Sequence, residues 1–131
     1  RVDDSVCAVR SALQEGILPG GGLALWRLAP DSSQSCDYRE EDLANRILHD
    51  ALKSPLLQIM ENAGLDGERI MDNDDLIDDT HGFDVKNEKY GDMYKMGVID
   101  PLKVTKNALI NATSVATTIL STNAIVTHAR A

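Results

Sequence analysis

The sequence predicts a mainly α-helical protein with one short β-hairpin near residues 82–92. Apolar residues recur at steps of three and four along several segments, which is typical of helices with one buried face. Glycine and proline separate these segments. With 131 residues, the chain has the usual length of about one domain.

The first expected helix covers residues 2–15 and ends at Gly16. A Pro-Gly-Gly-Gly turn then leads into a second helix, roughly 21–29, which ends at Pro30. The apolar stripe of the first helix consists of Val2, Val6, Val9 and Leu13.

A third helix is expected over roughly 40–53. Ser54 followed by Pro55 fits an N-cap and a first helical position, so a separate fourth helix should begin there and close at Gly64. A short helix then leads into an acidic loop within residues 66–82. The inner face of the fourth helix is expected to hold Leu56, Ile59, Met60 and Ala63.

The stretch GFDVKNEKYGDMYKMGVIDP, residues 82–101, is polar and carries glycine next to aromatic residues at two points. It predicts the hairpin near 82–92. Asp100 is then expected to cap the longest helix, roughly 101–125, with Pro101 at its first position.

Charge and length exclude several classes of function. The chain has 13 Lys and Arg against 21 Asp and Glu, a formal net charge of −8, which argues against non-specific binding to nucleic acid or anionic membranes. A single nucleotide pocket is compatible with that balance. No apolar run approaches the ~20 residues of a membrane span, and no signal peptide is visible.

No metal site is predicted. Cys7 and Cys36 are interpreted as free thiols in a reducing compartment, because they form no metal-binding pattern. The acidic run 72–79 fails the calcium-loop pattern, since Leu76 and Ile77 stand where a ligand and a glycine are needed. We therefore expect millimolar calcium to leave the melting temperature unchanged.

Individual polar residues carry weak signals on their own. Gly20–Gly22 before a helix suits a phosphate contact or a purely structural turn. Asp100 suits a cap or a ligand-binding carboxylate, and Asp84 suits a turn residue. Asp4 suits a solvated helix face or a general base.

Combined and in order, these segments resemble a known family. RVDDSVCAVRSALQEGILPGGGLAL (1–25), GFDVKNEKYGDMYKMGVIDPLKVTKNAL (82–109) and the later SVATTILSTNAIV resemble the group I chaperonins, the GroEL-type sixty-kilodalton family. The resemblance is strong over 1–29 and 82–126 and loose over 30–80. It implies that residues 1–15 are part of an intermediate-domain helix. Residues 16–131 would then be the C-terminal half of the equatorial ATP-binding domain, which is a helical bundle in that family. The first residues already look like the middle of a helix, so the chain looks cut from something larger.

The resemblance also implies a nucleotide site. Gly21 matches the glycine whose backbone borders the nucleotide, and Asp84, Val85 and Lys86 match hairpin residues that line the adenine and ribose. Asp100 matches the carboxylate that accepts bonds from the ribose hydroxyls. Lys86 stands where small residues are common in the family, so its contact is expected through the backbone or the alkyl stem.

Asp4 matches the intermediate-domain aspartate that promotes attack of water on the γ-phosphate. The implied parent is an ATPase that uses ATP with Mg²⁺ and K⁺ to capture, encapsulate and release non-native polypeptides. The phosphate loop and the magnesium ligand lie outside this chain, so the segment alone is expected to be inactive.

The implied partners are homo-oligomeric ring subunits, in heptameric rings, together with a cochaperonin and unfolded polypeptide bound through an apical domain outside this chain. No nucleic acid or membrane partner is expected. The implied location is the bacterial cytoplasm, with the mitochondrial or plastid matrix as the alternative. A different class of function stays open for the segment alone, a helical interaction module that assembles without nucleotide.

Overall fold

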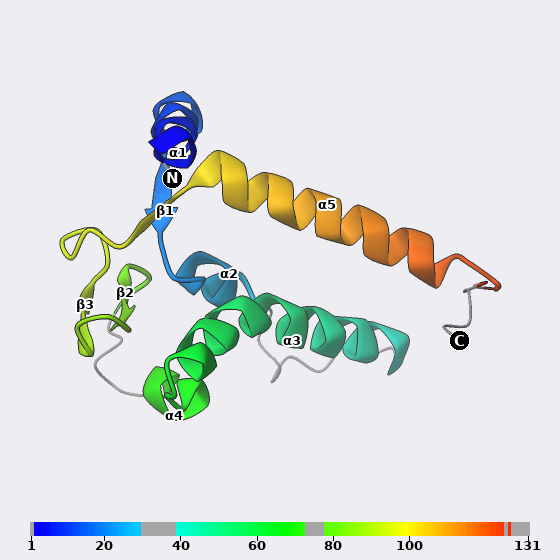
Figure 1. Ribbon diagram of the computed structural model, residues 1–131. Helices are drawn as coiled ribbons and strands as arrows, with labels where there is room; N and C mark the ends of the chain where they lie inside the picture. Colours follow the sequence, from blue (N-terminus) through cyan, green and yellow to red (C-terminus); the bar gives the residue numbers. More distant parts are fainter. Residues whose placement is uncertain (1, 30–38, 73–77, 125, 127–131) are drawn as a thin grey trace, which may run out of the picture. The chain divides into compact units, whose positions relative to one another are not determined.

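The computed structural model describes residues 2–29, 39–72, 78–124 and 126, and the chain divides into two compact units (Figure 1). One unit is Ile17–Asp100, and the other joins Arg1–Gly16 with Pro101–Ala131. The prediction of a mainly helical chain with a short hairpin is confirmed. A second pair of short strands, β1 (Ile17–Pro19) and β4 (Ile99–Pro101), was not predicted.

The unit of the two chain ends is built on α1 (Val2–Glu15) and α5 (Leu102–Leu120), which contact each other. Lys103 Nζ donates to Gln14 Oε1 at 2.7 Å, and Lys106 forms an ion pair with Glu15. The first helix has the predicted bounds. The last described helical residue of α5 is Leu120, five residues before the predicted end at 125, with Ser121 as its C-cap.

The prediction that Asp100 caps the last helix is wrong. The N-cap of α5 is Pro101, and no side chain caps it. Asp100 lies in the strand β4 (Ile99–Pro101), so it stands one residue too early for the cap position. Leu102 is the first residue of α5, so its N–H has no acceptor within the helix. It donates instead to the Gly16 carbonyl at 3.1 Å.

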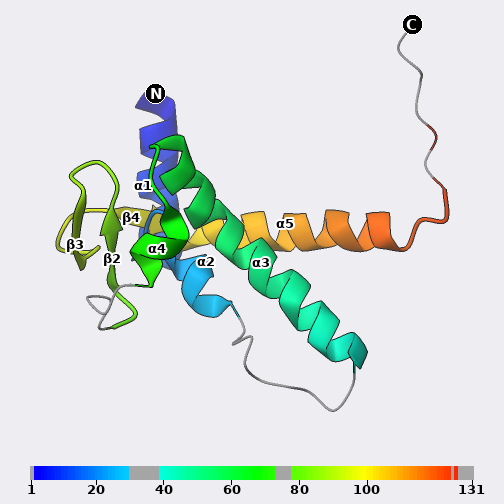
Figure 2. The same ribbon diagram turned by 90° about the horizontal axis from the view of Figure 1, so that it is seen from below.

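In the described residues of the unit 17–100, the elements are three helices and two small sheets (Figures 1 and 2). The strand β2 (His81–Asp84) pairs antiparallel with β3 (Lys89–Asp92), with His81 opposite Asp92 and Asp84 opposite Lys89. The strand β1 (Ile17–Pro19) pairs with β4. The helices are α2 (Leu23–Leu28), α3 (Arg39–Asn62) and α4 (Gly67–Met71).

The predicted break at Ser54–Pro55 is also wrong, because α3 runs through Pro55 as one helix. A proline inside a helix costs about 3 kcal/mol, since it removes one hydrogen bond and crowds the preceding turn. Leu52, Leu56 and Met60 follow one another at helical spacing across the proline, and all are less than 10% exposed. Burial of this continuous face offsets the cost of the proline.

Methionine fills much of the core of this unit, as the low aromatic content requires. Trp26, Phe83 and other partly buried side chains pack around the fully buried ones. The buried cluster consists of Leu23, Leu56, Met60, Met71 and Met93. Ile59 and Ala63, which were expected on the inner face, are exposed.

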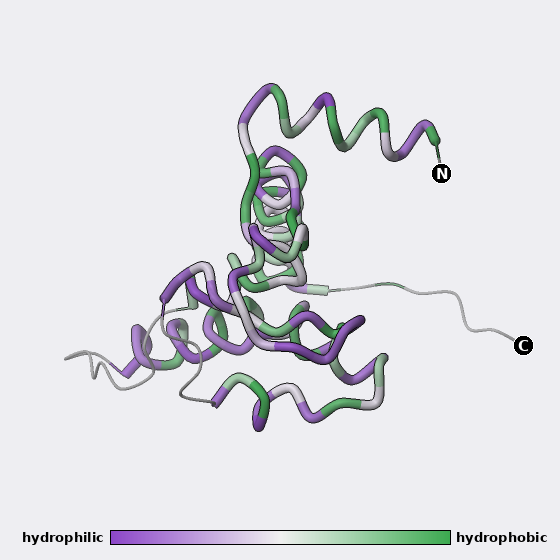
Figure 3. The backbone as a smooth tube through the Cα atoms, turned by 90° about the vertical axis from the view of Figure 1, so that its left-hand side faces the viewer, coloured by the Kyte–Doolittle hydropathy of each residue, from purple (hydrophilic) through white to green (hydrophobic). Residues whose placement is uncertain are grey.

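Long apolar faces remain exposed on the described helices. Hydrophobic positions recur along α1 (Figure 3), and its Val2 and Leu13 are 77% and 84% exposed. Neither α1 nor α5 has a buried residue. Among the described residues, no helix is long and apolar enough to cross a membrane. Cys7 is a free, exposed thiol, whereas Cys36 and most of the acidic run 72–79 lie outside the described residues.

Candidate functional site

A cavity of about 500 Å³ lies inside the unit of residues 17–100. This volume is within the size range of small-molecule sites. Four segments of the sequence line the cavity: Gly21, Ile59–Met60, Phe83–Asn87, and Met93 with Met96–Ile99, of which Ile99 belongs to β4.

The Gly20–Gly22 turn brings α2 and the cavity wall together. Gly21 and Gly22 have positive φ angles of 67° and 80°, which residues with a side chain rarely adopt. A Cβ on Gly22 would lie 2.9 Å from the backbone nitrogen of Leu56 in α3. The N–H of Gly20 donates to the Val98 carbonyl at 2.9 Å, which ties the turn to the residues just before β4.

Asp84 closes the polar end of the cavity and is only 6% exposed. Its Oδ1 accepts from the backbone N–H of Lys86 at 3.0 Å, and its Oδ2 accepts from Asn87 Nδ2 at 2.6 Å. The bond from Asn87 is the main reason that the pKa of Asp84 lies below its ordinary value, and burial opposes this shift. The carboxylate is therefore ionised at neutral pH.

Apolar side chains form another part of the lining. Met60 and Met93 are 2% exposed, and Met96 and Val98 pack against the same core. Phe83 is held edge-on to Tyr90, with ring centroids 4.9 Å apart. Apolar side chains thus stand beside the polar hairpin residues in one lining, a combination that is typical of small-molecule sites.

The structure brings four of the six sequence-predicted site residues together. Gly21, Asp84, Val85 and Lys86 all line the cavity. Asp100 does not line it; it is half-buried in β4, next to the lining residue Ile99.

Asp4 is exposed on α1, in the other compact unit. Lys86 is the cavity's one cationic lining residue among those described. The described lining therefore offers one positive charge to a ligand.

Sequence reasoning missed Asn87 and the apolar wall of Ile59, Met96 and Val98. Asn87 stands three residues after Asp84, and that spacing in a turn is the signal that could have found it. The apolar wall has no local signal, because a buried methionine in a core and one in a cavity wall look alike in sequence.

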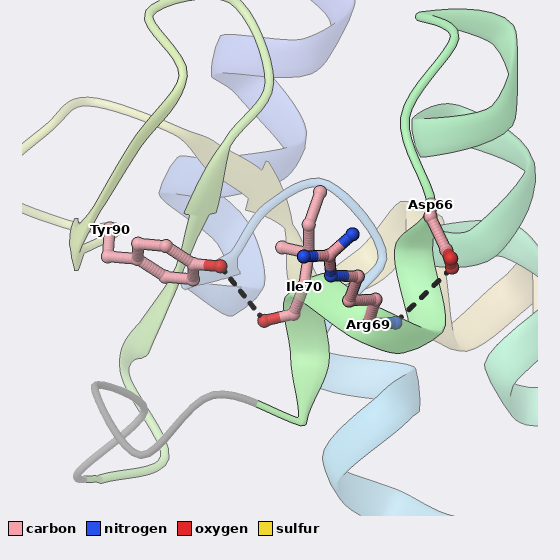
Figure 4. A pocket seen from close by; sticks show the side chains of 4 residues that line it. All are labelled: Asp66, Arg69, Ile70 and Tyr90. Carbon is pink, nitrogen blue, oxygen red and sulfur yellow. Dashed lines mark hydrogen bonds between the residues drawn. The ribbon is translucent and has the colours of Figure 1, made fainter.

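Two other cavities in this unit are lined by structural contacts. In the first, Asp66 Oδ1 caps α4 by accepting from the Arg69 N–H at 3.3 Å, and the Tyr90 hydroxyl donates to the Ile70 carbonyl at 3.2 Å (Figure 4). In the second, Lys53 Nζ lies 4.3 Å from the centre of the Trp26 ring, a cation–π contact. The described part of the chain holds no group of three or more His, Cys, Asp or Glu arranged to bind a metal.

Comparison with known proteins gives one consistent family. Residues 1–130 match the sequence profile of the TCP-1/cpn60 chaperonin family. The chain is 40% identical over 133 residues to Chaperonin GroEL 2 of Cereibacter sphaeroides, covering 98% of this chain and 24% of the relative. A crystal structure of a group III chaperonin in the open state matches with a TM-score of 0.74 and 29% identity, covering 88% of this chain and 25% of that one. The chain thus spans about a quarter of the length of these relatives.

Proposed function

The chain belongs to the TCP-1/cpn60 chaperonin family, and from that premise we propose that it is the C-terminal equatorial part of an ATP-dependent protein-folding chaperonin of group I. The whole protein would bind and hydrolyse ATP to drive the capture, encapsulation and release of non-native polypeptides. The observation that carries the proposal is the cavity that joins Gly21 to the hairpin residues Asp84–Lys86. The similarity to a GroEL protein supports group I.

The proposed domain division assigns residues 1–15 to an intermediate-domain helix and 16–131 to the equatorial domain. It rests on the resemblance of the two sequence blocks, because the compact units group residues 101–131 with 1–16. α1 ends at Glu15 and a left-handed Gly16 follows, which supports a boundary at this point.

In the proposed site, the base lies against the apolar wall and the Val85–Lys86 backbone, and Gly21 borders the nucleotide from the α2 turn. Asp100 does not line the cavity but follows the lining residue Ile99 in β4, and on the strength of the resemblance it is proposed to accept bonds from the ribose hydroxyls. ATP supplies the γ-phosphate that is transferred to water. Mg²⁺ and K⁺ would be held by residues outside this chain.

Asp4 is proposed as the carboxylate that orients the attacking water. General-base catalysis contributes typically 10²–10⁴-fold to a rate. In the full-length protein, Asp4→Ala should therefore lower ATP turnover by about 10²-fold or more and leave ATP binding intact. Asp3→Ala is the matched control, because the neighbouring residue is also an exposed carboxylate on α1. Equal turnover in both variants and wild type would withdraw Asp4 from catalysis.

The partners and location follow the family in the proposal: homo-oligomeric rings, heptameric in group I, with a cochaperonin and unfolded polypeptide bound through the apical domain, in the bacterial cytoplasm. The competing proposal is a helical interaction module without nucleotide activity. Exposed apolar faces on α1, α3 and α5 favour an assembly role for this segment. Titration with ATP separates the two, because a pure assembly module should show no nucleotide-dependent change at Gly21 or Asp100.

A further inference from the structure

Asp84 is the one buried charged residue among the described residues. It shares its strand face with Gly82, where an added Cβ would lie 2.9 Å from Leu23 Cδ2 and 3.0 Å from Met93 Sδ. The carboxylate therefore points toward the core and the cavity rather than toward solvent. A buried carboxylate is tolerated only where hydrogen bonds replace its lost water.

Two bonds from its own loop replace that water. Lys86 N–H binds Oδ1 at 3.0 Å, and the side-chain amide of Asn87 binds Oδ2 at 2.6 Å. Each carboxylate oxygen thus holds one position of the loop Val85–Glu88 between β2 and β3. The same loop contains Glu88 with a φ of 50°, a conformation that needs support from its surroundings.

This loop supplies three residues to the cavity, Val85, Lys86 and Asn87. Asn87 is otherwise exposed, so its bond to Asp84 is the contact that ties its side chain to the site. A loop held at both carboxylate oxygens presents its backbone in one shape, which reduces the ordering that ligand binding would otherwise require.

We propose that Asn87 is a positioning residue of the base pocket: its amide fixes the Asp84 carboxylate and thereby the shape of the loop that discriminates between nucleotide bases. The inference rests on the proposed nucleotide site and deepens it. Asn87 itself need not touch the ligand. Loss of its amide frees one carboxylate oxygen and lets the loop move, so affinity and base preference should change together.

The test uses the full-length protein with Asn87→Ala, Asn87→Ser and, as the matched control, Lys89→Ala, whose exposed side chain stands in the same hairpin. Calorimetric titration gives the dissociation constants of ATP and GTP for each variant. Hydrogen exchange of a peptide covering residues 83–90 reports the loop without nucleotide.

Asn87→Ala should weaken ATP binding about tenfold, change the ATP-to-GTP affinity ratio and speed exchange in the loop, because a buried carboxylate loses one partner. Asn87→Ser keeps a hydroxyl donor and should recover part of each effect, while Lys89→Ala should match wild type. Unchanged affinity, ratio and exchange in Asn87→Ala would overturn the inference. A wild-type protein that binds no nucleotide would instead defeat the proposed function, and the exchange data would still test the loop.

Discussion

Substitution of Gly22 by alanine tests how the cavity wall is built. Gly22 is the N-cap of α2 with a φ of 80°, and an added Cβ would lie 2.9 Å from Leu56 N and 3.0 Å from Leu56 Cα. Both of these atoms are helix backbone, so neither can turn away as a flexible side chain would. Gly64 has nearly the same φ, 78°, and an added Cβ there would meet nothing within 4 Å.

A comparison of the two positions separates the cost of a left-handed backbone from the cost of a steric clash. A left-handed residue with a side chain costs roughly 1–2 kcal/mol, and this term applies to both. Overpacking costs typically about 1–3 kcal/mol and applies to Gly22 alone. Gly22→Ala should therefore lose roughly 2–5 kcal/mol of unfolding free energy, about 1–3 kcal/mol more than Gly64→Ala.

The assay is urea unfolding of the 131-residue chain at low concentration, followed by the fluorescence of Trp26. It is the chain's single tryptophan and packs against the core of the unit that holds both glycines. With a slope of about 1–3 kcal/mol per molar urea, the midpoint of Gly22→Ala should fall about 1 M below that of Gly64→Ala. Equal midpoints would refute the close approach of α2 to α3.

Three further predictions concern the same chain. Folding lowers the pKa of Asp84 from its ordinary value of 3.8, so its stabilising contribution is present above that value and is lost as the pH falls through the folded pKa. Asp84→Asn should therefore reduce the dependence of unfolding free energy on acid pH. Tyr90→Phe, which loses the bond to the Ile70 carbonyl, should cost about 1 kcal/mol by urea unfolding while the Phe83 contact remains. The chain alone should bind a dye for apolar surfaces and self-associate, and a non-binding monomer by light scattering would contradict this.

Local signals in the sequence predicted where helices and turns lie, but not how tertiary packing changes them. Pro55 ends a helix by local rules, yet burial of Leu52, Leu56 and Met60 on one continuous face keeps α3 intact across it. Asp100 is a good cap by local rules, yet pairing of β4 with β1 extends the backbone there and moves the cap to Pro101. In both cases the deciding partner lies far away in the sequence or on a different turn of the helix.

The candidate site was likewise predicted only in part. Gly21 and the 84–86 hairpin were predicted from a resemblance between sequence blocks, and the structure places all of them on one cavity. The spacing of apolar residues could not have predicted that these residues lie on one cavity, because a backbone hydrogen bond from the Gly20 N–H to the Val98 carbonyl connects their parts of the chain. Neither residue has a side chain that takes part in that bond, so the sequence carries no local sign of it.

A cavity assembled by backbone pairing has a consequence for its chemistry. Methionine, valine and isoleucine supply most of the apolar part of its lining, and these side chains offer a ligand packing contacts rather than strong hydrogen bonds. Selectivity then depends on the few polar groups that remain, and among the described lining residues the Asp84 carboxylate is the buried one. Because two groups of its own loop hold both oxygens of Asp84, the hairpin rather than the helices is the part of the proposed nucleotide site where a substitution should change which base is preferred.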